Sequence, residues 1–202
     1  MTSSDAARPP LGLPPGSIRG LLSLQIVITF WLLLAMPEDK QKPIPMNLYF
    51  LLTMVFVFFV SHGKSIAKKA DPTPSPLWLP GGTLRLVIMG GTAAILAFLA
   101  VNHPTYFDRL TPDRDSLHEW KYYLAATCGG FFVGYLFRLF PFRNSWAFQS
   151  FQAWISLIAM FSLFLETILQ VFVKPTLTDS LDFLTWQTAV TGIVACYYGT
   201  RS

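Results

Sequence analysis

Three polar side chains at helical spacing are the residues of this chain whose types most suggest chemistry. Ser162, Glu166 and Gln170 follow one another every four positions, so on an α-helix they form one polar stripe. The stretch around them, residues 146–173, is mostly apolar and long enough to cross a bilayer. The stripe therefore places a carboxylate inside a membrane span.

A carboxylate at this depth costs about 3 kcal/mol unless it is protonated, paired or facing water. Two roles for Glu166 follow. In the first, Glu166 and Gln170 line a polar pathway that binds a cation or a proton. In the second, Glu166 is hydrogen-bonded between helices, to Lys121 near the outer end of the preceding span or to Gln187 in the last one. The sequence leaves both roles open.

The region 102–119 holds acidic residues and histidines that superficially resemble a divalent-metal cluster. They are His103, Asp108, Asp113, Asp115, His118 and Glu119. However, Ser116 and Glu119 have the spacing of a capping box before the next helix. We interpret the region as a solvated loop and predict no metal site, no catalytic residues and no cofactor.

A short sequence element occurs twice, 66 positions apart. Residues 11–21 read LGLPPGSIRGL and residues 77–87 read LWLPGGTLRLV, which aligns Ser17 with Thr83 and Arg19 with Arg85. Each copy precedes an apolar stretch. The hydroxyl group can cap the helix that follows. Alternatively, the helix start and its arginine contact an anion such as a lipid phosphate.

Small residues recur every four positions in three of the apolar stretches. The stripes are Gly90-xxx-Ala94, Ala126-xxx-Gly130-xxx-Gly134 and Thr188-xxx-Gly192-xxx-Cys196. Such stripes let helix backbones approach closely within a membrane. The spacing predicts helix packing at these faces, either within one chain or between chains.

The composition identifies the elements that must position these residues. Of 202 residues, 52% are apolar and 13% are charged, whereas about 25% of a soluble domain is charged. Six apolar stretches approach the length of a membrane span: 18–36, 47–61, 83–101, 120–140, 146–173 and 183–199. We predict an all-α, polytopic transmembrane bundle of about six spans, arranged as two or three repeated helical hairpins.

The distribution of Lys and Arg predicts the orientation of this bundle. With a cytoplasmic N-terminus, nine of the 15 basic residues lie on inner segments, the side that the positive-inside rule favours. These are Arg8, Arg19, Lys64, Lys68, Lys69, Arg85, Arg138, Arg143 and Arg201. The predicted order is a cytoplasmic segment 1–17, a hairpin 18–61, a cytoplasmic basic and Pro-rich linker 62–82, a hairpin 83–140 with the outer acidic loop 102–119, and a hairpin 141–202.

These features predict a membrane protein without naming an activity. We expect a non-enzymatic structural or accessory subunit of the bacterial inner membrane, with both termini cytoplasmic. It would pack with itself or with a larger membrane partner through its small-residue faces and contact anionic lipid head groups. The basic charge is a topology signal, so no nucleic-acid partner is expected. The alternative is a small oligomeric ion channel or transporter lined by Glu166 and Gln170.

Overall fold

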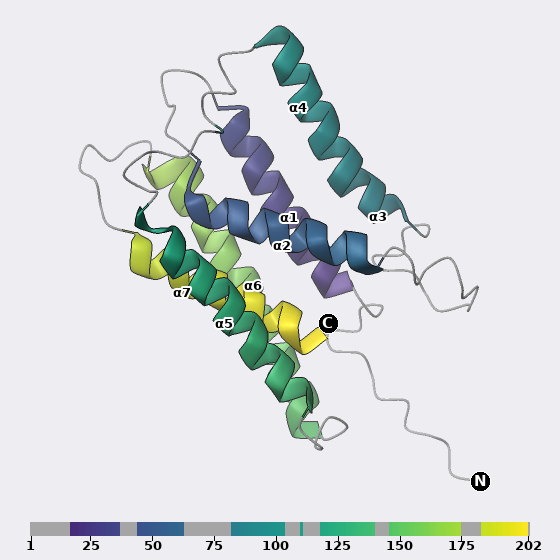
Figure 1. The fold of residues 1–202 in the computed structure, drawn as a ribbon, viewed down its shortest axis with the longest axis vertical. Coiled ribbons are helices and arrows are strands. Elements are labelled where there is room, and N and C mark those ends of the chain that lie inside the picture. The colour runs from purple at the N-terminus through teal and green to yellow at the C-terminus, as the bar shows by residue number, and fades with distance from the viewer. Residues whose placement is uncertain are drawn as a thin grey trace.

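The computed structural model describes residues 17–36, 44–62, 82–103, 110, 118–139, 146–174 and 183–201. This part of the chain is helical and contains no strand (Figure 1). Its α-helices are α1 (Ser17–Leu34), α2 (Met46–His62), α3 (Thr83–Arg85), α4 (Gly91–Asn102), α5 (Trp120–Leu139), α6 (Trp146–Ile168) and α7 (Leu184–Arg201). Two π-helical turns, η5 (Leu86–Gly90) and η9 (Leu169–Val173), connect α3 to α4 and extend α6. The all-α prediction is confirmed for the residues described.

These elements form six continuous helices, whose ends agree with the six predicted apolar stretches to within two residues. Three of them are long and apolar enough to cross a membrane: Ser17–Leu34, Thr83–Asn102 and Ser150–Val173. The apolar part of α2, Met46–Ser61, is shorter. The structure thus agrees with the prediction of a membrane protein at the level of three candidate spans.

The core of the bundle lies between α1, α2, α6 and α7. Leu22 and Ile26 of α1, Leu51 of α2 and Val194 of α7 are fully buried in it. The opposite sides of the helices are also apolar, and Phe161 of α6 is 69% exposed. Large exposed apolar surfaces are unfavourable in water, but they are what a lipid-facing surface requires.

Contacts between neighbouring helices fix their relative directions. The α1 and α2 helices are antiparallel, because Arg19 lies near Phe58 and Phe30 lies near Tyr49. In Figure 1, α1 and α6 run in one general direction, and α2, α5 and α7 run in the opposite one.

The packing of α5 does not follow the order of the helices in the sequence. The main contacts of α5 are with α7 and α2, and those of α4 are with α1, although α4 and α5 are neighbours in the sequence. Glycine explains why α5 packs on α7, because the glycine-bearing sides of the two helices let their backbones touch. The sequence neighbours α1 and α2, and α6 and α7, do pack together.

Candidate functional site

Glu166 lies inside the bundle, and the polar stripe around it faces other helices. Its side chain is only 1% exposed, and Ser162 and Gln170 are buried on the same side of the helix. The stripe therefore faces protein rather than lipid, which either of its two predicted roles would require.

Three N–H donors from three segments surround the Glu166 carboxylate. The indole Nε1 of Trp186 donates to Oε2 at 2.7 Å. The amide Nε2 of Gln170 donates to Oε1 at 2.9 Å, and Nδ2 of Asn47 donates to the same oxygen at 3.4 Å. We call these four residues the Glu166 cluster.

The helix ends place the donors around the carboxylate. Asn47 and Trp186 lie in the first turns of α2 and α7, and Gln170 lies in the π-helical turn η9, one turn after Glu166. Turns of this kind often occur at functional positions. Because α6 is antiparallel to both α2 and α7, its C-terminal end meets the N-terminal ends of those two helices.

The donors to Glu166 are neutral groups, so the cluster holds the carboxylate by hydrogen bonds. Hydrogen bonds to a charged group contribute about 1.5–3 kcal/mol each, and here they offset the loss of hydration on burial. One acceptor, Oδ1 of Asn47, is buried without a partner among the described residues. Chemically, the cluster ties α2, α6 and α7 together through one carboxylate.

Neither of the two possible partners, Lys121 and Gln187, is among these donors to Glu166. Oε1 of Gln187 instead accepts a hydrogen bond from the Tyr123 hydroxyl at 2.7 Å, which connects α7 to α5. The ammonium group of Lys121 is exposed and lies 5.3 Å from the centroid of the Tyr122 ring. Gln187 thus bonds to α5 rather than to α6, and Lys121, which is part of α5, is directed to the outside of the bundle.

Sequence reasoning missed Asn47 and Trp186. A tryptophan near a span end is readily assigned to the membrane interface. This assignment did not suggest that the indole N–H of Trp186 donates a hydrogen bond inside the bundle. A signal for Asn47 was present, since it is the most polar residue of the largely apolar stretch 47–61. Such a residue within a span is expected to face protein.

Further hydrogen bonds connect the helices away from the cluster. The hydroxyl groups of Ser23 and Tyr198 are 2.6 Å apart and join α1 to α7. Those of Thr29 and Thr167 are 2.7 Å apart and join α1 to α6. These hydroxyl pairs tie α1 to α6 and α7 in addition to the Glu166 cluster.

Two of the predicted small-residue faces meet inside the chain. A Cβ atom added to Gly130 of α5 would overlap the carbonyl oxygen of Gly192 in α7, and one added to Gly134 would overlap that of Cys196. Ala126 lies against Gly192 in the same interface. Thr188 lies on the same helix as Gly192, and its hydroxyl is buried without a partner among the described residues. The sequence left open whether small-residue faces pack within one chain or between chains. In the structure, these two faces pack within one chain.

The third small-residue face does not pack in this way. Gly90 and Ala94 are exposed, as are Ala93 and Ala97, and they lie opposite the side of α4 that packs on α1. The neighbouring Gly91 is not on this exposed face. A Cβ atom added there would overlap the ring of Trp31 in α1.

The repeated element precedes helices that begin at equivalent residues, Ser17 and Thr83. Ser17 is buried, and the guanidinium of Arg19 lies 4.6 Å from the centroid of the Phe58 ring. At the second copy, Gly82 rather than Thr83 occupies the cap position, with φ of 92° and no side-chain capping hydrogen bond. Only glycine adopts this left-handed conformation without strain. Arg85 follows on α3, half-buried.

Most of the acidic loop, including Asp108, Asp113, Asp115 and Ser116, lies outside the described residues, as does the linker from residue 63 to residue 81. Within the part of the chain that is described, no three His, Cys, Asp or Glu side chains group as metal ligands. The carboxylate of Glu119 accepts a hydrogen bond of 3.3 Å from the Tyr123 hydroxyl.

Comparison of the chain with protein-family models, curated proteins and solved structures finds no match. Its function has to be argued from its geometry.

Proposed function

We propose that this chain is a non-enzymatic, multi-pass subunit of the bacterial inner membrane that associates with a second copy or with a larger membrane protein through α4. The observation that carries the proposal is the position of the helix Thr83–Asn102. Only 17% of it is buried, against 56% of Ser17–Leu34, although it is the most apolar of the three candidate spans.

The exposed side of this helix is suited to helix packing. Gly90, Ala94 and Ala97 lie near the middle of that side, opposite the buried Ile88 and Thr92. Small residues at this spacing allow another helix to approach closely in lipid. The equivalent residues of α5 and α7 are already used within the chain, which leaves α4 as the docking helix.

Six membrane crossings with both termini cytoplasmic are part of this proposal. The helix directions support it, because α1 and α6 run opposite to α2, α5 and α7, as alternate crossings require. The excess of Lys and Arg on the inner segments supports the same orientation. The six helices would then form three consecutive pairs in the membrane, although α5 packs mainly on α7.

The Glu166 cluster supports a structural role over the channel alternative. Both carboxylate oxygens are engaged by donors of the same chain. A pathway residue would need an open side toward water or an ion.

The test is the assembly state of Ala94→Trp in lipid nanodiscs, with Ala100→Trp, about 120° around the same helix at another exposed position, as the matched control. The wild type should be an oligomer or carry a larger subunit. The Ala94 variant should weaken association by about tenfold, equivalent to about 1.4 kcal/mol, while the control should associate normally. A wild type that is strictly monomeric without a partner would overturn the proposal.

A further inference from the structure

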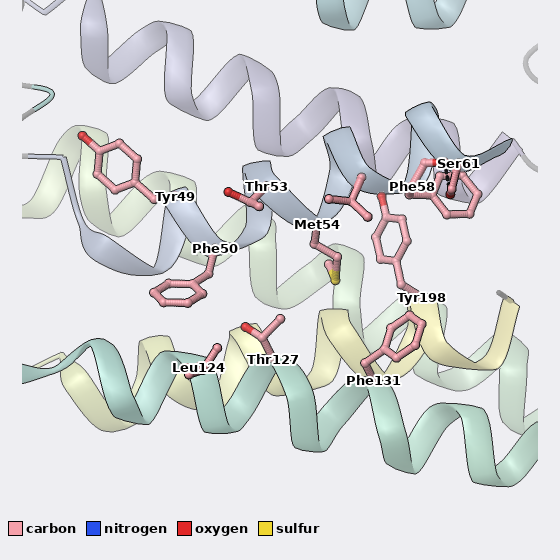
Figure 2. A pocket seen from close by; sticks show the side chains of 11 residues that line it. Tyr49, Phe50, Thr53, Met54, Phe58, Ser61, Leu124, Thr127, Phe131 and Tyr198 are labelled. Atoms are coloured by element: carbon pink, nitrogen blue, oxygen red, sulfur yellow. Dashed lines mark hydrogen bonds between the residues drawn. The ribbon is translucent and has the colours of Figure 1, made fainter. Parts of the chain in front are cut away.

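An apolar groove runs between α2 and α5, with α7 as its floor (Figure 2). Its volume is about 460 Å³. Its lining consists of Tyr49, Phe50, Thr53, Met54, Val57, Phe58 and Ser61 of α2, Leu124, Thr127 and Phe131 of α5, and Tyr198 of α7.

The packing of the three helices explains why the groove is there. Glycines hold α5 tightly against α7, and Phe58 packs edge-on against Tyr198, which holds α2 on the same helix. The α2 and α5 helices therefore sit side by side on α7 without closing the space between them. Near Phe50 and Tyr123, whose ring centroids are 6.3 Å apart, aromatic rings bridge the gap.

The groove opens onto the apolar outer surface of the bundle. Val57 on its rim is 62% exposed, and Leu124 and Phe131 on the facing wall are also exposed. From Tyr49 to Ser61 the α2 wall extends about 18 Å at 1.5 Å per residue. This length matches one leaflet of the roughly 30 Å hydrocarbon core, which is the length that a single acyl chain covers.

Lys121, at the start of α5, lies near one end of the groove, and two arginines lie near the other. The Arg19 guanidinium stacks on the ring of Phe58, which lines this end. Arg138 follows Phe131 by two helical turns on the same side of α5. In the proposed orientation this end faces the cytoplasmic leaflet, where anionic head groups are concentrated.

We propose that the groove binds one acyl chain of an anionic phospholipid, whose phosphate lies beside Arg19. The apolar walls account for the acyl chain, and the arginine at the inner end accounts for the head group. The proposal concerns α1, α2, α5 and α7. It rests on the orientation proposed above, but it does not depend on docking through α4.

The test is native mass spectrometry of full-length protein extracted in mild detergent from vesicles of equal parts phosphatidylglycerol and phosphatidylcholine. The wild type should retain one phosphatidylglycerol per chain, in about fivefold preference over phosphatidylcholine, since one basic residue near the surface contributes this much. Arg19→Gln should remove the preference, and the control Lys121→Gln, at the opposite end of the groove, should keep it.

Two variants fill the groove from opposite walls. Thr53→Trp on α2 and Thr127→Trp on α5 should each lower retention of both lipids severalfold, whereas Phe132→Trp, on the outer side of α5, should leave it unchanged. Equal retention of the two lipids by the wild type would overturn the assignment of the phosphate. If a groove variant keeps wild-type helicity and still retains lipid as the wild type does, the acyl-chain site is overturned. A groove variant that changes the mass of the assembly instead of the amount of bound lipid would also overturn it.

Discussion

The indole N–H of Trp186 donates to Oε2 of Glu166 at 2.7 Å, which joins α7 to α6 inside the bundle. The other oxygen of the same carboxylate accepts from Gln170 and Asn47. A single acidic residue thus fixes the relative positions of three helices. Changes to the Glu166 cluster should therefore lower the stability of the folded protein and should not affect transport.

Trp186→Phe should destabilise the protein by about 1.5–3 kcal/mol, the contribution of a hydrogen bond to a charged group. The ring is kept, so the change removes the N–H donor rather than the packing. Unfolding in mixed detergent micelles, followed by circular dichroism, measures the effect. Trp154→Phe is the matched control, since Trp154 is 65% exposed, and it should change stability by less than about 0.5 kcal/mol.

Glu166→Gln and Glu166→Leu should differ sharply. In the glutamine variant the amides of Asn47 and Gln170 can rotate to accept from the new NH₂ group, so we expect a loss of about 1 kcal/mol. Leucine leaves the donors unpaired and should cost about 3–5 kcal/mol. Neither change should alter the conductance of planar bilayers that contain the protein. A conductance present in the wild type and lost in Glu166→Gln would favour the channel alternative.

The positions of the helices could be predicted from the sequence, whereas their partners could not. Apolar length and the Pro-Gly element before Ser17 and Thr83 give the helix starts, because these signals are local. The pairing of α5 with α7 depends on which small-residue faces meet. All of these faces have small residues every four positions, so this spacing does not identify the partner.

The site illustrates the same limit. The depth of Glu166 and the direction of its stripe follow from helical periodicity, so its burial could be expected. Its donors lie on other helices, and their identity depends on the rotation of α2 and α7 about their axes. Gln187, the predicted donor, is one residue from Trp186, which is a rotation of about 100° on a helix of 3.6 residues per turn.

The Ser23–Tyr198 contact should show measurable coupling between α1 and α7. We expect a double-mutant cycle with Ser23→Ala and Tyr198→Phe to give an interaction energy of about 0.6–1.7 kcal/mol, the range of hydrogen bonds between membrane helices. The readout is the free energy of unfolding in mixed micelles. Additive effects of the two changes would mean that the hydroxyl groups do not interact in the folded protein.

Gly129 and Gly130 are adjacent on α5 but have opposite surroundings, so they form a matched pair for testing the α5–α7 contact. A Cβ at Gly129 meets nothing within 4 Å, whereas one at Gly130 overlaps the backbone of Gly192. Gly129→Ala should stabilise the protein by up to about 1 kcal/mol, because alanine favours the helix more than glycine does. Gly130→Ala should destabilise it by at least about 1–3 kcal/mol, because the obstacle is backbone and the two helices must separate to admit a methyl group. Thermal unfolding of both variants in the same detergent measures the difference. Equal stability of the two variants would contradict the direct contact between the α5 and α7 backbones, and with it the argument that only α4 keeps a small-residue face for a partner.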